Sequence, residues 1–403
     1  MLIRVDFNVP LNEKNEITDD ARIVKSLDTL KYCLSQNAKI ILMSHLGRPK
    51  GKPEAPFSLK PAAGHLSKLL GKKVELLSDC VGPDVEKKVA ALKSGEVVLL
   101  ENLRFHAEEE KNDPAFAKKL ALLGEVYVND AFGTAHRAHA STEGVAKYLP
   151  AVAGFLLAKE VEYFDKATSN PDRPFIAILG GAKVSDKIKL ISNLLDKTDT
   201  ILIGGAMAYT FYKVLGIGIG NSKFDPAGEG AAREALAKSK AKGVPIILPV
   251  DRVIAQKMEK GTPTQVVTGD IPEGWSGFDI GPQTRREFKE ILAKAKTIVW
   301  NGPLGLFEIP PFDEGTRDVA KFVAELSSAS GGKVTTIIGG GDTAAAVMQF
   351  GLESKMSHVS TGGGASLEYL EGTALPGVTA LADKSAQPSA DPSSGGKLSF
   401  NRK

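Results

Sequence analysis

Short apolar runs alternate with amphipathic stretches along most of this chain, and this alternation constrains its fold more than any other feature. In the first part, runs rich in β-branched and apolar residues end in polar ones, as in LIRVDF, AKIILMSH, EVVLLEN and EVYVND. Between them lie helical patterns such as ARIVKSLDTLKYCLSQ and DPAFAKKLALLG. Strands that alternate with helices in this way predict a parallel sheet covered by helices.

A second series of strands and helices follows one long amphipathic stretch, AGFLLAKEVEYFDKATSN, which predicts a single helix that ends before Pro171. The series includes PFIAILGGAKVSDK, DTILIGGAMAYTF, VPIILPVD, TIVWNGPLG, KVTTIIGGGDTAAAV and SHVSTGGGASLEYL. Because 403 residues exceed one ordinary hydrophobic core, we predict two Rossmann-like α/β domains joined by the long helix and a hinge. We place them at 1–153 and 171–378, with the helix at 154–170.

The C-terminal tail, 379–403, has a different composition. From about residue 383, Ser, Pro, Gly and Lys predominate and apolar residues are scarce, which predicts disorder.

Charge and cysteine content exclude several classes of protein. A formal net charge of +3 is nearly neutral for this length and argues against general nucleic-acid binding. Cys33 and Cys80 are too few for a disulfide framework, fit a reducing compartment, and have no metal-type neighbour at CxxC spacing. No apolar run approaches the roughly 18 residues that cross a bilayer, and MLIRVDFNVP predicts a strand, not a signal or transit peptide.

Glycines recur directly after predicted strands and before predicted helices, at Gly180, Gly204, Gly339 and Gly362. Such turns let backbone N–H groups approach a ligand, and the helix start adds partial positive charge, so phosphate is favoured. For any single turn, tight packing is the favoured explanation. Four of them on one sheet would gather at one edge and favour a nucleotide site.

The motifs of several known classes of nucleotide-binding protein are absent or incomplete in this chain. The P-loop pattern, GxxxxGK followed by Ser or Thr, is absent, as are the protein-kinase HRD and DFG motifs. GGGDTA at 339–344 matches GxGxxA, but a dinucleotide-binding unit also needs an acidic residue at the end of the next strand, where Ser360 and Thr361 stand. A nicotinamide-dependent oxidoreductase is therefore disfavoured.

Two lysines and one aspartate could bind a polyphosphate and its Mg²⁺. Lys183 and Lys187 are four apart at a predicted helix start and would project from one face, although a solvated lysine face explains them equally. Asp342 follows the GGG turn and could be a Mg²⁺-side carboxylate, a helix N-cap, or both.

Arginines and polar residues of the first domain lie in loops or at predicted strand ends, on the expected ligand side of the sheet. The set comprises Arg22, Arg48, Arg104 and Arg137 with Asp6, Asn8, His45, His136 and His139. Arginine suits bidentate binding of phosphate and carboxylate, so the set predicts a pocket for a small, doubly anionic molecule. Single-stranded nucleic acid would need aromatic platforms, for which only Phe7, Phe105 and Phe132 qualify loosely.

Eight motifs in order resemble the phosphoglycerate kinase family. They are RVDFNVP, SHLGRP, ENLRF, NDAFGTAHRAHAST, GGAKVSDKI, WNGPLGLFE, IIGGGDTA and STGGGASLE, and the resemblance runs from Arg4 to about Val378. The loops are most similar to the cyanobacterial and chloroplast branch. Three features depart from the family: the residues that usually precede RVDFNVP are missing, Ala206 replaces a glycine, and the tail after Leu381 has no counterpart.

The resemblance implies two sets of site residues. The 3-phosphoglycerate side would comprise Asp6, Phe7, Asn8, Arg22, His45, Leu46, Gly47, Arg48, Arg104 and Arg137. The nucleotide side would comprise Lys187, Gly281, Asn301, Glu308, Gly340, Gly341, Asp342 and Thr343. Arg22, Lys183 and the amides of Gly340 and Gly341 would act on the transferring phosphoryl group, and Asp342 would lie on the Mg²⁺ side.

The implied reaction is 1,3-bisphosphoglycerate + ADP ⇌ 3-phosphoglycerate + ATP, with Mg²⁺. The resemblance also implies domain closure, for which 154–170 and the STGGGAS segment are the hinge candidates. We expect a cytoplasmic monomer acting on small molecules, with no nucleic acid or membrane partner and with the plastid stroma as the alternative location. The rival hypothesis is a homologue that keeps both pockets as a nucleotide- and anion-binding module without turnover.

Overall fold

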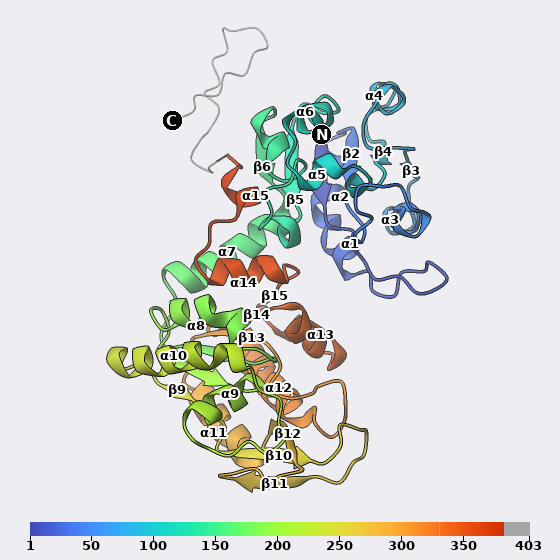
Figure 1. Cartoon of the computed structure of the whole chain (residues 1–403). Helices are drawn as coiled ribbons and strands as arrows, with labels where there is room; N and C mark the ends of the chain where they lie inside the picture. The colour runs from blue at the N-terminus through green and yellow to red at the C-terminus, as the bar shows by residue number, and fades with distance from the viewer. Residues whose placement is uncertain (330, 383–403) are drawn as a thin grey trace. The chain divides into compact units, whose positions relative to one another are not determined.

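The computed structural model describes residues 1–329 and 331–382 (Figure 1); the tail predicted to be disordered from about 383 lies outside them. The described residues form two compact units, 1–157 together with 376–382, and Ala158–Leu375. Residues 376–378, which the sequence placed in the second domain, lie with the first unit, because the Gly377 N–H donates to the Ala135 carbonyl (2.8 Å). The other predicted boundaries stay predictions.

The first unit is built on a six-stranded sheet in the order β3-β4-β2-β1-β5-β6, and every strand pair in it is parallel. Its strands are β1 Leu2–Val5, β2 Ile40–Met43, β3 Val74–Leu76, β4 Val97–Leu99, β5 Tyr127–Asp130 and β6 Ala151–Ala153. The predicted parallel sheet is therefore confirmed, and β3 and β6 are strands that the sequence pattern did not reveal.

Helices cover both faces of this sheet because successive side chains of a strand point to opposite faces. Leu2 packs in a core with Val85 of α4 and Phe116 of α6, whereas Ile3 packs in the opposite core. The helices are α1 Ala21–Lys25, α2 Leu27–Ser35, α3 Lys60–Leu70, α4 Pro83–Ala90, α5 Ala107–Glu110, α6 Pro114–Ala121 and α15 Pro376–Thr379. One predicted helix is divided into α1 and α2 at Ser26, whose hydroxyl donates to the Ile23 carbonyl (2.8 Å).

The second unit contains another six-stranded parallel sheet, in the order β15-β14-β13-β7-β8-β9. Its strands are β7 Phe175–Leu179, β8 Thr200–Ile203, β9 Ile246–Ile247, β13 Thr297–Asn301, β14 Thr335–Gly339 and β15 His358–Val359. The chain leaves β7 toward β8 and β9 and later returns to the other side at β13. The topological switch point, where doubly wound sheets bind ligands, is therefore between β7 and β13.

A small antiparallel sheet, in the order β11-β10-β12, was not predicted from the sequence. Its strands are β10 Asp251–Ala255, β11 Gln265–Thr268 and β12 Ser276–Ile280. β11 is mostly exposed and carries little apolar signal, so periodicity does not reveal it.

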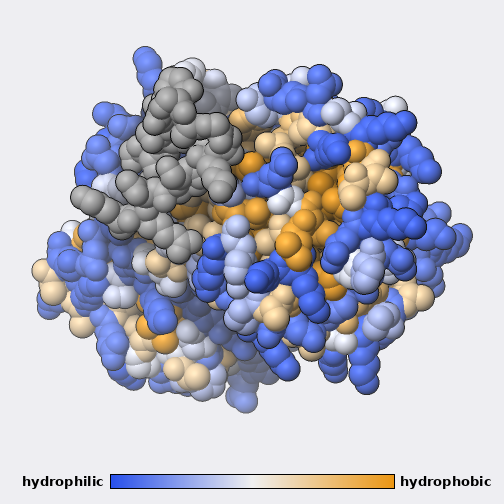
Figure 2. Space-filling model, turned by 90° about the horizontal axis from the view of Figure 1, so that it is seen from above, coloured by the Kyte–Doolittle hydropathy of each residue, from blue (hydrophilic) through white to orange (hydrophobic). Residues whose placement is uncertain are grey.

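The helices of the second unit include the predicted long helix, α7 Phe155–Ser169, which begins in the first unit. The others are α8 Ile188–Leu194, α9 Met207–Val214, α10 Glu229–Lys242, α11 Pro282–Leu292, α12 Glu314–Ala329, α13 Gly341–Gln349 and α14 Gly364–Leu370. In the described residues no helix is both long and apolar enough to cross a bilayer. Figure 2 shows a face that is largely hydrophilic around a hydrophobic area near its middle.

A buried carboxylate anchors α7 to the end of β15 within the second unit. Glu160 is fully buried; its Oε2 lies 2.6 Å from His358 Nε2, and its Oε1 accepts from the Thr361 N–H (2.7 Å) and hydroxyl (2.8 Å). The Tyr163 ring stacks on His358 at 4.8 Å. Burial opposes ionisation of Glu160, but these partners outweigh it and hold its pKa below the usual value.

Removal of this carboxylate should destabilise the second unit. Glu160→Ala leaves His358 and the Thr361 N–H without their buried partner, so we expect a loss of about 3 kcal/mol in the free energy of unfolding, measured in urea. Because the folded pKa of Glu160 is depressed, its contribution is present above the unfolded value and is lost as the pH falls through the folded value. Glu160→Gln is the isosteric control, and equal stability of the alanine variant and the unaltered chain would contradict the assignment.

Candidate functional site

The predicted polar residues of the first unit do meet at the carboxyl ends of β1, β2 and β4. Arg22 Nη1 donates to Asp6 Oδ2 at 2.5 Å, the Gly47 N–H donates to Asn8 Oδ1 at 2.9 Å, and Arg104 Nη1 donates to the Gly47 carbonyl at 2.8 Å. Parallel strands bring these residues together because all their carboxyl ends lie at one edge of the sheet.

Asn102 fixes the loop that follows β2 through side-chain hydrogen bonds. It is buried, its Nδ2 donates to the carbonyls of Leu46 (2.7 Å) and Phe57 (2.8 Å), and its Oδ1 accepts from the Arg104 N–H (3.0 Å). The side chains of Phe7 and Leu46 are buried in the core, so only their backbone could face a ligand. Of the other predicted residues, Arg48 is exposed, and Arg137 is partly buried with its Nε 3.1 Å from His136 Nε2.

Arg4 is a residue of this cluster that the sequence reasoning missed. It lies in the middle of β1, is almost fully buried, donates to Val5 O and to Ser141 Oγ (2.9 Å), and places Nη2 3.0 Å from His45 Nδ1. A charged residue inside the apolar run LIRVDF is the signal that could have revealed it, because arginine is seldom buried without a specific partner.

Burial and the positive charge of this edge together lower the pKa values of the neighbouring imidazoles. Burial, followed by the charges of Arg4, Arg104 and Arg22, holds the pKa of His45 well below its usual value. Burial and the arginines also lower the pKa of His139 to about 3. Glu109 lies beneath the cluster with Ser141 as its partner (Oγ to Oε1, 2.5 Å), and burial raises its pKa. The edge therefore has an excess of guanidinium charge that suits a multiply charged anion.

Lys187 lies at the switch point of the second sheet. Its Nζ donates to the carbonyls of Gly180 (2.7 Å), which follows β7, and Asn301 (2.9 Å), which ends β13. Burial lowers the pKa of Lys187 to about 8, although Asp342 and Asp186 favour its charged form. The ammonium group is therefore held at the position where doubly wound sheets bind phosphate-bearing ligands.

The expectation that Lys183 and Lys187 project from one helix face is wrong. The helical turn begins only at Ser185, as a 3₁₀ segment Ser185–Lys187 before α8. Lys183 precedes it and is exposed, whereas Lys187 turns inward onto the two carbonyls. The four-residue spacing aligns side chains only inside a continuous α-helix, which is why the prediction failed.

The glycine-rich turns are of two kinds, those packed against other backbone and those with open space beside them. The turns after β7, β8 and β13 pack on one another: a Cβ at Gly205 (φ +65°) would lie 2.6 Å from Gly181 N and 2.8 Å from Pro303 O. A Cβ at Gly341 would meet nothing within 4 Å, and the nearest neighbour of a Cβ at Gly340 (φ +83°) would be the Asn301 side chain, at 3.0 Å. Packing therefore accounts for the first kind, while the turn into α13 is open toward a ligand.

The start of α13 combines an open helix N-terminus with an exposed carboxylate. The N-cap is Gly340, so the N-cap alternative for Asp342 is wrong; Asp342 lies in the first turn and is exposed. Thr343 is buried, and its Oγ1 accepts from the Gly302 N–H at 2.6 Å, which fixes α13 against the turn after β13. One carboxylate beside open amides at a helix N-terminus would fit the way Mg²⁺ accompanies nucleotides.

Two further predicted nucleotide residues lie outside this turn. Gly281 precedes α11, where the Asp251 carboxylate accepts from the N–H groups of Gln283 (2.9 Å) and Thr284 (2.7 Å). A side chain at Gly281 would collide with that carboxylate, so packing explains this glycine. Glu308 is exposed in the loop that follows β13.

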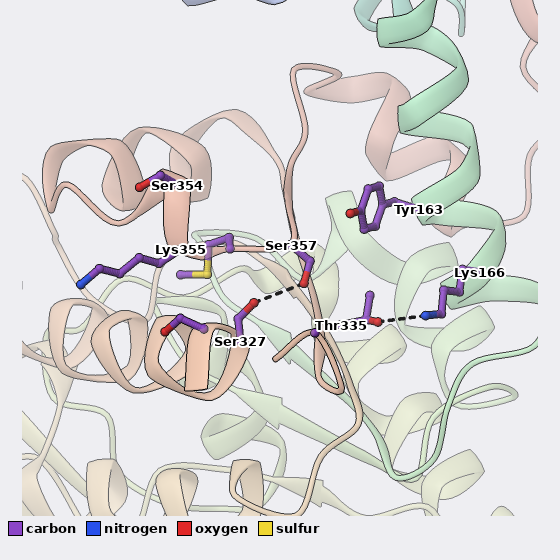
Figure 3. Close-up of a pocket in the computed structure, with 10 residues that line it drawn as sticks. Tyr163, Lys166, Ser327, Thr335, Ser354, Lys355 and Ser357 are labelled. Carbon is purple, nitrogen blue, oxygen red and sulfur yellow. Dashed lines mark hydrogen bonds between the residues drawn. The ribbon is translucent and has the colours of Figure 1, made fainter. Parts of the chain in front are cut away.

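A cavity of about 430 Å³ in the second unit lies away from this edge (Figure 3). Its lining includes Tyr163 and Lys166 of α7, and Lys166 Nζ donates to Thr335 Oγ1 at 3.2 Å. Thr335 is the first residue of β14, whereas Gly340 follows the last. The cavity is therefore at the amino ends of the strands and is not the predicted nucleotide site.

The low pKa of Lys187 predicts a pH dependence of stability. Between about 8 and 10.5 the unfolded chain holds a proton on this lysine that the folded chain has released, so the free energy of unfolding should rise with pH. We expect Lys187→Met to remove up to about 3 kcal/mol of that rise, measured by urea unfolding at both ends of the interval. The exposed-lysine variant Lys189→Met should keep it, and an unchanged pH profile in Lys187→Met would contradict the burial of this charge.

Comparisons with known proteins agree with one another. A family model described as phosphoglycerate kinase matches residues 1–373. The chain is similar to the phosphoglycerate kinase of Fervidobacterium nodosum (56% identity, covering 96% of each chain) and to the chloroplastic one of Volvox carteri (56%, covering 95% of this chain and 83% of that one). It is also similar to the solved structure of phosphoglycerate kinase from Coxiella burnetii, with a TM-score of 0.85, 43% identity and coverage of 94% and 95%.

Proposed function

The chain belongs to the phosphoglycerate kinase family, and on that premise we propose how its residues transfer a phosphoryl group between 1,3-bisphosphoglycerate and ADP. As a member of this family the chain is a phosphotransferase. The observation that carries the residue assignments is the chemistry of the two sheet edges. One edge concentrates guanidinium groups around neutral imidazoles, and the other joins an open helix N-terminus to a buried ammonium group.

The first unit binds the phosphoglycerate. A carboxylate and a phosphate on one small molecule need several bidentate donors, which Arg22, Arg48, Arg104 and Arg137 supply. The Asp6 carboxylate orients Arg22 through their 2.5 Å contact. Burial and then its arginine neighbours hold the pKa of His45 well below its usual value, so His45 would contribute a hydrogen bond and no charge.

The second unit binds the nucleotide. The amides of Gly340 and Gly341 face the phosphates at the N-terminus of α13, and Lys187, Asn301 and Thr343 hold the surrounding turns. Asp342 would hold Mg²⁺, which offsets the charge on the phosphate oxygens when it is bound. Gly281 and Glu308 enter this site through the family resemblance alone.

The reaction needs no general base. In both directions the attacking oxygen is already ionised, as a carboxylate or as an ADP phosphate, so no proton has to be removed. Catalysis then depends on in-line positioning and on positive charge around the moving phosphoryl group. We assign this charge to Arg22 in the first unit and to Lys183 in the second, and Lys183 is exposed and so free to contact a ligand.

Lys183→Ala tests the assignment. Because Lys183 is assigned to the transition state, its loss should lower kcat by about a hundredfold or more and change KM little. The measurement is a coupled assay of ATP consumption that depends on 3-phosphoglycerate and Mg²⁺. Lys189→Ala, which removes an exposed lysine from the same segment, is the matched control. An unchanged kcat in Lys183→Ala would refute its role, and absent turnover in the unaltered chain would favour the binding-module hypothesis.

We also propose that the chain acts as a cytoplasmic monomer on small molecules. Its relatives include proteins named as cytosolic, from Nicotiana tabacum, and as chloroplastic, from Volvox carteri. Cys33 and Cys80 are both free and buried, which suits a reducing compartment.

A further inference from the structure

Two loops of the first unit, far apart in the sequence, bring together three side chains that could bind a metal ion. β3 and β4 are parallel neighbours, with Leu76 paired to Leu99, so the segments that follow them meet at one edge of the sheet. Asp79 and Cys80 follow β3, and His106 follows the 3₁₀ segment Leu103–Phe105 after β4. One oxygen, sulfur or nitrogen atom of each lies within 4.8 Å of the other two, and the described part of the chain holds no other such group of three or more His, Cys, Asp or Glu.

The three side chains are held in place before any ligand binds. His106 Nε2 lies 2.7 Å from Asp79 Oδ1, which also accepts from the Cys80 N–H at 2.6 Å. The His106 ring packs against Phe116, with ring centres 5.2 Å apart. Cys80 is fully buried, whereas the side chains of Asp79 and His106 are 47% and 27% exposed. An ion could therefore reach the group from solvent past the carboxylate and the imidazole.

The donor set selects a particular kind of cation. Sulfur, imidazole nitrogen and carboxylate oxygen together are typical of Zn²⁺ sites, whereas Mg²⁺ and Ca²⁺ prefer oxygen ligands alone. Ligand atoms at 2.0–2.3 Å from a tetrahedral Zn²⁺ are about 3.5 Å apart. The observed separations, from 2.7 Å to at most 4.8 Å, bracket this value. Three protein ligands leave a fourth position for water.

We propose that Asp79, Cys80 and His106 form a binding site for Zn²⁺ or another thiophilic divalent cation. On binding, the Cys80 thiol releases its proton to solvent and the sulfur bonds to the metal, while His106 Nε2 exchanges its contact with Asp79 for the ion. The bound ion would join the loop after β3 to the segment that carries Arg104.

The test is a titration of the full, chelator-treated chain with Co²⁺, which reports both sulfur ligation and geometry. We expect one equivalent to produce a near-ultraviolet thiolate-to-cobalt charge-transfer band and the visible bands of four-coordinate Co²⁺. Zn²⁺ should abolish both, and a large excess of Mg²⁺ should not. Absence of the charge-transfer band in the unaltered chain would overturn the proposal.

Variants distinguish this site from other metal-binding positions on the chain. Cys80→Ser should remove the charge-transfer band, and His106→Gln and Asp79→Asn should each weaken Co²⁺ affinity by about tenfold or more. Cys33→Ser removes the other buried cysteine and is the matched control; its titration should equal that of the unaltered chain. A band that persists in Cys80→Ser, or that disappears in Cys33→Ser, would contradict the site.

A measurement on the unaltered chain tests the site without relying on variants that could misfold. X-ray absorption of the one-to-one Zn²⁺ complex should show a single sulfur neighbour at about 2.3 Å with nitrogen or oxygen neighbours at about 2.0–2.1 Å. A coordination shell of nitrogen and oxygen alone would mean that Zn²⁺ binds elsewhere and would refute the participation of Cys80.

Discussion

Parallel pairing of every strand in the two large sheets is the constraint on which the rest of this structure depends. It sends all the carboxyl ends of a sheet to one edge, and each crossover must run back over a face as a helix. Residues that follow different strands, such as Asp6, His45 and Arg104, therefore meet although the chain separates them widely. The same rule brings Asp79 and Cys80 to His106.

Positive charge exceeds negative charge at the carboxyl-end edge of the first sheet. Arg4 is buried inside β1, and its partners are Ser141, His45 and the Val5 carbonyl. Burial of unpaired charge is costly, so such a cluster persists only where the rest of the fold holds it. Burial, and after it the repulsion from the arginines of this edge, opposes protonation of His45 and depresses its pKa. If this edge binds an anion as proposed, the ligand would supply the missing negative charge, and binding would stabilise the folded chain.

Glycine performs two distinct tasks in the second unit. After β7 and β8 it lets backbone turns lie against one another and against the turn after β13. Before α13 it leaves the amides of Gly340 and Gly341 uncovered. Lys187 contributes to the packed region, because its ammonium group donates to carbonyls at the ends of both β7 and β13. The cost is a buried cation whose pKa falls to about 8.

The sequence by itself determined the two parallel α/β units, the long helix α7 and most of the arginine cluster, because periodicity and strand-end residues are local signals. It did not reveal the exposed strand β11, the partners of Arg4, or the different settings of Lys183 and Lys187. Each of these depends on which segments become neighbours after folding. Only the tertiary structure decided which glycines pack and which stay open, and that Cys80 lies beside His106, because contacts between distant segments leave no periodic trace in the chain.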